Sequence, residues 1–285
     1  MNRILNQKRL HQLQQFHPKL ENVWYLVASA TFSVCNRPEE IPLIYHQALS
    51  TQNGKPIDDR AKIIHELLES NRSDSLKADS LMESINETYK NPIQYEVQIT
   101  KKLREALLIT YPLGGLPKAI NSLSQLKSVT PSALLPCVNQ DVDITNPNLN
   151  TDALFQDTLR ANPKTIEEYK KVTDDGIKYW NNVYNKVSNK VFHNISKSYP
   201  DMIYFIIKHT YGPLFSFNKI LNEKEKCLII VSALVPQDVD AQLYGHLKGA
   251  LNAGCDKEVV SLIQDMSIMI STWCGVRSSN KISKL

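Results

Sequence analysis

Apolar residues recur at helical spacing along most of this chain, whereas the alternation typical of strands is scarce. The most regular stretch lies near the C-terminus, where an apolar residue follows every three or four positions in Val259, Ile263, Met266, Ile270 and Trp273. Asp256 stands at the N-cap position of this stretch, and the acidic Glu258 suits the positive end of a helix dipole. Such a chain buries its apolar side chains by packing helix against helix, so we predict an all-α fold.

The same criterion predicts helices in the ranges 22–34, 61–68, 98–111, 117–126, 165–184 and 202–211. Thr165 and Glu168 form a capping-box pattern at the start of one of these helices. The segment from Pro112 to Gly115 is expected to end another, because proline lacks a donor and glycine loosens the backbone. Helices separated by such signals are typical of a helical bundle.

The first twenty residues are basic and contain no acid, which faintly resembles a mitochondrial presequence. However, Leu10, Leu13 and Phe16 fall at helical spacing within this segment. We therefore favour an amphipathic helix that packs onto the body of the protein.

Helical periodicity fades from 128 to 163, where prolines and a run rich in Asn and Asp predict a long surface connection. We therefore predict an N-terminal unit at 1–127, a linker at 128–163, a C-terminal unit at 164–276 and a tail at 277–285. Within the tail, Ser283, Lys284 and Leu285 form a C-terminal Ser-Lys-Leu, the tripeptide that the peroxisomal import receptor reads. This signal predicts the peroxisome matrix as the location and the import receptor as a partner.

Composition excludes several classes of function. The formal net charge is +4, and no run of Lys and Arg is longer than a pair, so nucleic acid is not an expected partner. The apolar runs are too short to span a bilayer, so we expect no membrane span. The five cysteines include no Cys-x-x-Cys pair, and no metal, flavin or nucleotide motif stands out, so we expect free thiols and no cofactor.

The stretches 224–234 and 242–260 combine a charged start, an apolar helix, a histidine followed by Ala-Leu-x-x-Gly, and a capped helix. This order resembles the core of the carboxymuconolactone decarboxylase and alkylhydroperoxidase D-like family, over about 167–275. The resemblance implies an all-α fold, a small-molecule substrate and a homo-oligomer formed through these helices. It would also make the chain a peroxisomal member of that family, acting on a small metabolite or in peroxide metabolism.

A weaker copy of the pattern occupies 22–30, 45–49 and 103–123 in the first half. We therefore predict two tandem alkylhydroperoxidase D-like repeats, of which the first is degenerate. When Ala48 is set on Ala250, Ile44 falls where His246 stands, so the first copy has an apolar residue at the histidine position.

The peroxidase branch of the family uses a Cys-x-x-Cys pair followed by a histidine, and this chain has Val239, Gln242 and His246 at those positions. Without the thiols, the dithiol mechanism does not transfer. A substitute thiol at Cys227, Cys255 or Cys274 stays open, although Cys227 and Cys274 have apolar surroundings that suggest burial.

The decarboxylase branch keeps the histidine, so His246, assisted by Gln242, is our candidate for acid–base catalysis. The alternative interpretation is a core histidine bonded to a backbone carbonyl. The other histidines are expected at the surface or in packing roles, and the charged residues from Glu223 to Lys226 in a solvated first turn. Loss of the cysteines leaves a rival function open, that of a non-catalytic oligomeric or partner-binding scaffold.

Overall fold

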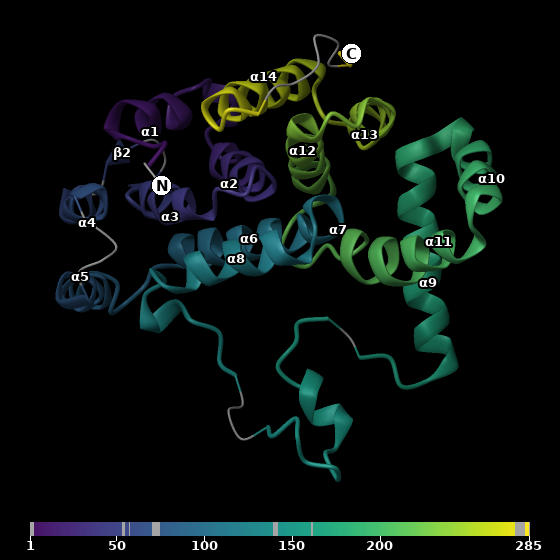
Figure 1. Ribbon diagram of the computed structural model, residues 1–285, viewed down its shortest axis with the longest axis horizontal. Helices are drawn as coiled ribbons and strands as arrows, with labels where there is room; N and C mark the ends of the chain where they lie inside the picture. The colour runs from purple at the N-terminus through teal and green to yellow at the C-terminus, as the bar shows by residue number, and fades with distance from the viewer. Residues whose placement is uncertain are drawn as a thin grey trace.

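The computed structural model describes residues 3–52, 55–56, 58–69, 75–138, 142–160, 162–276 and 283–284. Helices make up nearly all of the regular structure in these ranges (Figure 1). The exception is one antiparallel ladder of two residues per strand, in which Thr51 pairs with Pro56 and Gln52 with Lys55. The predicted all-α class is confirmed.

The elements of the first half, in chain order, are α1 (Gln7–Gln14), η1 (Pro18–Leu20), α2 (Trp24–Val34), η2 (Pro38–Glu40), α3 (Ile41–Leu49), β1 (Thr51–Gln52), β2 (Lys55–Pro56), α4 (Asp58–Glu69), α5 (Ser75–Thr88), α6 (Gln94–Ile109), α7 (Tyr111–Gly114) and α8 (Leu116–Lys127). The elements of the second half are η3 (Ser132–Leu134), η4 (Thr151–Phe155), α9 (Ile166–Tyr184), η5 (Asn185–Val187), α10 (Ser188–Ser198), α11 (Pro200–Phe205), η6 (Ile206–Phe215), α12 (Glu223–Leu234), η7 (Val235–Gln237), α13 (Asp240–Asn252) and α14 (Lys257–Trp273).

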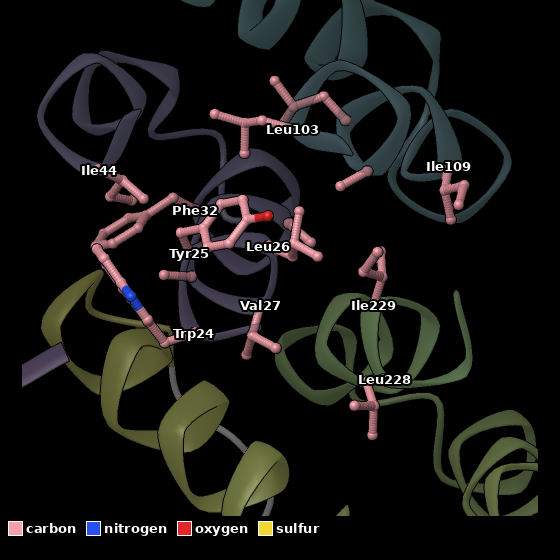
Figure 2. Packing of buried hydrophobic residues seen from close by; sticks show 14 of the residues in the cluster. Trp24, Tyr25, Leu26, Val27, Phe32, Ile44, Leu103, Ile109, Leu228 and Ile229 are labelled. Atoms are coloured by element: carbon pink, nitrogen blue, oxygen red, sulfur yellow. The ribbon is translucent and has the colours of Figure 1, made fainter. Parts of the chain in front are cut away.

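Helices α2 and α12 pack against each other at the centre of the molecule. Every residue of α2 is buried, as expected of a helix that is apolar on all sides. Figure 2 shows its side chains between α6, which carries Leu103 and Ile109, and α12, which carries Leu228 and Ile229. One continuous core therefore joins the two halves of the chain.

Two sets of three helices have the same order and similar lengths. Helices α2, α3 and α6 contain 11, 9 and 16 residues, and α12, α13 and α14 contain 12, 13 and 17. In both sets a short 3-10 turn with a proline follows the first helix, and a residue with positive φ lies beside it, Asn36 at 57° or Asp238 at 56°. The first set differs by the insertion of α4 and α5 before its third helix.

The predicted helix starts agree well with the structure. Thr165 and Glu168 form the expected capping box of α9, and the side chain of Asp256 accepts from the backbone N–H groups of Glu258 and Val259 at the start of α14. Helix α1 buries Leu10 and Leu13 against the body, which confirms the amphipathic helix. Of the helices described, none has both the length and the apolar character needed to cross a membrane.

Two predicted helices differ in detail. The helix expected over 202–211 is α-helical only to Phe205 and continues as the π-helix η6, which contains Pro213. Helix α9 crosses η6 so closely that a Cβ on Gly176 would lie 2.6 Å from the backbone nitrogen of Gly212, so only glycine fits there. The segment from Pro112 to Gly115 was expected to end a helix without forming one. It instead forms most of the one-turn helix α7, which ends where Gly115 adopts a φ of 99°.

Between α8 and α9 the described residues form only the 3-10 turns η3 and η4. This connection lies outside the helical body, at the bottom of the view in Figure 1. Helices α9, α10 and α11 form one end of the molecule, at the right of the same view. Helix α13 packs on both α9 and α12, which places the predicted histidine where that end meets the central core.

Candidate functional site

Helix α13 holds His246 against α9. Its buried face consists of Leu243, His246, Leu247, Gly249 and Ala250. Gly249 permits a close approach, because a Cβ there would lie 2.8 Å from Cγ1 of Val183 on α9. The result is a histidine that is only 8% exposed, with its ring turned toward the aromatic residues at the end of α9.

Tyrosines surround one side of His246. The ring of Tyr184 meets the imidazole edge to face with the centroids 6.1 Å apart, and its hydroxyl lies 3.4 Å from the hydroxyl of Tyr211. Trp180 packs on both tyrosines, at centroid distances of 4.3 and 5.0 Å. The imidazole therefore contacts Tyr184, which belongs to an aromatic cluster with Trp180 and Tyr211.

Burial sets the charge of these groups. It lowers the pKa of His246 to about 4, so the imidazole is neutral near pH 7. Burial raises the pKa of Tyr184 and holds that of Tyr211 well above its ordinary value, so both phenols stay protonated. In the part of the chain that the structure describes, no hydrogen bond fixes the His246 ring, in contrast to the interpretation of a histidine bonded to a backbone carbonyl.

The structure does not bring Gln242 to the histidine. Gln242 lies one turn before His246 on α13, but its side chain is exposed. Lys248 and Tyr244 are also exposed, and the Lys248 Nζ lies 5.5 Å from the centre of the Tyr244 ring. A role for Gln242 stays a prediction that depends on where a ligand would lie.

The thiols nearest this region are poorly suited to ionise. Cys227 is buried, its Sγ lies 3.8 Å from the Tyr179 hydroxyl, and burial raises its pKa to about 12. Burial likewise raises the pKa of Cys255 to about 11. Cys274 is only partly buried. The first two thiols stay protonated near pH 7 and are weak nucleophiles.

The charged first turn of α12 was predicted to be solvated, and this is wrong for its second half. Lys226 has no exposed surface, and its Nζ donates to the carbonyl of Phe217 at 3.1 Å and also to the carbonyl of Phe215 and the side chain of Asn218. Burial lowers the pKa of Lys226 to about 8. The ammonium group satisfies carbonyls at the end of η6, a role that only the folded chain reveals.

Glu225 is also mostly buried, and its carboxylate bonds to Lys102 on α6 at 2.5 Å. The apolar pattern that follows is readable in the sequence, but the partners of Glu225 and Lys226 lie on other segments. The apolar periodicity of the sequence therefore does not indicate that Glu225 and Lys226 are buried.

The first half of the chain contains a second buried histidine, His46 on α3. It has no exposed surface, and its Nε2 bonds to the carbonyl of Val129 at 2.9 Å. Burial lowers its pKa to about 4 as well. Tyr89 packs beside the ring at 5.9 Å, and the fully buried carboxylate of Glu96 pairs with Arg60 nearby. The expectation of a packing role for this histidine fits its surroundings.

Two hollows lie away from His246. One, of about 530 Å³, lies among α1, η1, α3 and α4 and is lined by polar residues such as Gln14 and Gln47. The other, of about 500 Å³, lies between α6 and the connection after α8 and is mostly apolar. Within the described ranges, no group of three or more His, Cys, Asp or Glu residues could hold a metal ion.

Ser283, the first residue of the C-terminal tripeptide, lies beside α13 and α14. The backbone N–H of Ser283 donates to Asp240 Oδ1 at 2.9 Å, and the side-chain amide of Gln264 donates to the Ser283 carbonyl. Lys284 is exposed, and Leu285 falls outside the described residues. Ser283 is therefore held by the body of the protein, whereas Lys284 remains accessible.

Comparison with known proteins gives a clear relationship at the level of sequence. No protein-family model matches the chain, so the resemblance to carboxymuconolactone decarboxylases finds no support there, and no solved structure matches it. The chain is 47% identical to "Peroxisomal protein 2" of Saccharomyces cerevisiae over the whole of both chains. It is 30% identical to "Peroxisomal protein 2" of Schizosaccharomyces pombe over 96% of this chain and 97% of that one. The chain therefore belongs to the family of proteins named Peroxisomal protein 2, and it is a peroxisomal protein.

Proposed function

We propose that this peroxisomal protein is a cofactor-independent enzyme that uses His246 in acid–base chemistry on a small organic acid or a thioester-derived metabolite. The observation that carries the proposal is the state of the His246 imidazole. It is neutral and nearly buried, and within the described residues no hydrogen bond engages its nitrogens. A neutral imidazole with a free nitrogen can accept a proton from a bound substrate.

An anionic substrate would improve this base. With a pKa of about 4 the imidazole is a weak base, because burial disfavours its protonated form. A carboxylate bound against the ring would stabilise the imidazolium and raise that pKa toward neutrality. The protonated hydroxyl of Tyr184, which accepts a hydrogen bond from Tyr211, is a donor suited to the oxyanion that forms when a carbon acid loses its proton. This logic favours small organic acids as substrates.

The arrangement of the helices supports a relationship with carboxymuconolactone decarboxylase-like repeats, which we propose as 1–127 and 164–276 joined by the linker 128–163. Helices α2, α3 and α6 have the same order as α12, α13 and α14, and their first connections share a 3-10 turn with a proline beside a residue of positive φ. In this comparison the fully buried Ile44 occupies the position of His246. Catalysis is therefore assigned to the second repeat alone.

The raised pKa values of Cys227 and Cys255 argue against peroxide reduction by these thiols. Peroxide reduction requires a thiolate, and burial keeps both thiols protonated. Acid–base chemistry needs only groups that His246 and its tyrosine neighbours supply.

Exchange of carbon-bound hydrogen in D₂O tests the proposal across several classes of candidate substrate. The purified protein is incubated with 2-oxo acids, 3-oxo acids and S-acetyl-N-acetylcysteamine, and deuterium incorporation and CO₂ release are followed by NMR. We expect at least one acid to exchange or decarboxylate faster with the protein, and His246→Ala to lose on the order of 100-fold in rate.

The matched control is His209→Ala, because His209 is exposed on η6 and belongs to no part of the site. This variant should keep the wild-type rate. The proposal is refuted if His246→Ala keeps the wild-type rate, or if the wild type accelerates neither exchange nor decarboxylation of any probe.

An oligomeric scaffold is the second candidate, and exposed apolar residues favour it. They concentrate on α10, α11 and the residues between and before them, in Val187, Phe192, Tyr199, Met202, Tyr204 and Phe205. We propose that a second copy of the chain covers this surface, since contiguous exposed aromatics on a soluble protein mark interfaces. Multi-angle light scattering of the wild type should give a multiple of the 32.4 kDa chain mass.

Phe205→Asp should dissociate that oligomer. Ile144→Asp is the control, because Ile144 is 76% exposed but lies in the connection between α8 and α9. A monomeric wild type, or equal dissociation by both variants, would remove this surface as the interface. An oligomer that retains no acid–base activity would favour the scaffold over the enzyme.

We also propose that Ser283, Lys284 and Leu285 bind the peroxisomal import receptor. The accessible Lys284 supports this role, and Ser283 would leave its contact with Asp240 when the receptor binds. Deletion of Leu285 should move a fluorescently tagged chain from peroxisomes to the cytosol, whereas an unchanged distribution would exclude the tripeptide as the signal.

A further inference from the structure

Two cysteines that are 239 positions apart in sequence meet at the ends of α2 and α14. Cys35 is the C-cap of α2 and Cys274 is the C-cap of α14. Their thiols lie close enough that each shifts the pKa of the other. Both residues are only partly buried, in contrast to Cys227 and Cys255.

The packing of the two helices accounts for this meeting. Thr31 lies one turn before the end of α2, and its Oγ1 is 3.3 Å from Ser267 Oγ on α14. Residues three or four positions apart share one face of a helix, so the next turn places Cys35 against Ser271 and Cys274. The two helices thus run in the same direction along this seam, and small side chains keep them close.

The surroundings of Cys35 favour its thiolate. The C-termini of both helices carry partial negative charge, which opposes ionisation. Lys118 counters this effect, because its ammonium binds the carbonyl of Val34 at 2.7 Å, and Arg37 adds a second positive charge. The neighbouring Cys274 thiol has the largest effect in lowering the pKa of Cys35, and the Cys35 thiol, together with burial, raises the pKa of Cys274.

We propose that Cys35 and Cys274 form a redox site at which a hydroperoxide drives formation of an intramolecular disulfide. This site lies on other helices than His246, and it requires neither a substrate nor activity there. It differs from the remaining cysteines, since Cys227 and Cys255 are buried and Cys137 is exposed.

The reaction balances with one hydroperoxide. The Cys35 thiolate attacks one peroxide oxygen, the O–O bond breaks, the alcohol or water leaves, and Cys35 becomes a sulfenic acid. The Cys274 sulfur then attacks the Cys35 sulfur, the S–O bond breaks, and hydroxide leaves with the Cys274 proton as water. Two thiols are oxidised by two electrons while the peroxide is reduced, and a thiol reductant restores the pair.

The disulfide would fasten the end of α2 to the end of α14, where the C-terminal tail begins. A link that closes so long a loop restricts the unfolded chain strongly. We therefore expect oxidation to raise the melting temperature by about 5 °C, within the range typical of native disulfides.

The test is oxidation of the reduced, full-length protein with hydrogen peroxide, followed by thiol counting and mass mapping of non-reduced peptides. Two of the five thiols should be lost at low peroxide, with one linked peptide containing Cys35 and Cys274. In Cys274→Ser, dimedone should trap a sulfenic acid on Cys35, and Cys35→Ser should form no disulfide.

Cys137→Ser is the matched control, because it removes an exposed thiol outside the pair and should leave the linked peptide unchanged. The proposal is overturned if Cys137 is oxidised before Cys35, if peroxide yields only dimers linked between chains, or if the linked peptide is absent from the wild type. These wild-type outcomes decide the matter even where a variant folds poorly.

Discussion

The two halves of this protein each bury a histidine, and burial lowers the pKa of both His46 and His246 to about 4. His46 has no exposed surface and is anchored to the carbonyl of Val129, beside the buried pair of Glu96 and Arg60. His246 keeps a small exposed fraction, lacks an anchor among the described residues and contacts Tyr184. The two histidines are therefore alike in burial and charge, and the hydrogen bond to Val129 distinguishes His46 from His246, our candidate base.

Replacing each histidine by alanine should give the largest difference in stability between the two halves. His46→Ala removes a hydrogen bond and leaves a cavity in a sealed part of the core, so it should lower the free energy of unfolding by about 3 kcal/mol. His246→Ala should cost about 1 to 2 kcal/mol, because water can fill the space at the surface. Urea denaturation measures both, and equal losses would contradict the distinction.

Acid should destabilise the protein through the same two groups. Both pKa values fall from 6.5 in the unfolded chain to about 4 in the folded one, so the unfolded state binds more protons between those limits. Their contribution is complete above pH 6.5 and disappears as the pH falls toward 4, by up to about 3 kcal/mol for each group. Urea denaturation from pH 7 to 4 should show a smaller loss in His46→Gln than in the wild type.

The same acid titration of His246→Gln should recover about as much stability as that of His46→Gln, because burial lowers both pKa values to about 4. If His246→Gln recovers no stability, the pKa of His246 is not lowered in the folded protein, which would contradict a neutral imidazole held by burial.

Lys226 provides a further test in the second half of the chain, where its ammonium group lies beside the Tyr179 ring. Lys226→Met would leave the carbonyls of Phe215 and Phe217 without their donor, and we expect a loss of about 2 kcal/mol at pH 7. Since the folded pKa of about 8 lies below the unfolded value of 10.5, the wild type should gain stability relative to Lys226→Met as the pH rises above 8. A pH-independent difference between the two proteins would show that Lys226 is solvated.

The smallest effect concerns the contact that positions α13. A Cβ at Gly249 would lie 2.8 Å from Val183 Cγ1, whereas one at Gly245 would lie at an ordinary 3.4 Å from the Tyr184 ring. Gly249→Ala should therefore cost about 1 kcal/mol and reduce His246-dependent activity, while Gly245→Ala should be neutral or slightly stabilising. Thermal unfolding and deuterium exchange measure both, and a loss of activity in Gly245→Ala alone would contradict the geometry.

Local sequence rules predicted the parts of the fold that depend on neighbours along the chain. The all-α class, the capping box of Thr165 and Glu168, and the cap at Asp256 are confirmed because each depends on residues within one helical turn. The peroxisomal location predicted from the C-terminal tripeptide agrees with the names of the two relatives. The proposed repeats and their boundaries stay predictions.

The features that the sequence did not indicate depend on contacts between distant segments. Lys226 looks like a surface residue until the segment at the end of η6 supplies its acceptors, and the π-helix η6 is crossed closely by α9 at Gly176. Cys35 and Cys274 show no motif, since only the packing of α2 on α14 brings them together. The candidate site at His246 is predicted from a spacing that resembles a known family, but the neighbouring tyrosines come from α9 and η6.

The measurement that tests the central claim most directly is the rate of deuterium exchange into the most reactive carbon acid, compared between His246→Gln and His46→Gln after both are shown to be folded. The account predicts that His246→Gln loses on the order of 100-fold in rate, while His46→Gln loses stability but keeps the rate per folded molecule. Equal rates in the two variants, or a loss confined to His46→Gln, would contradict it.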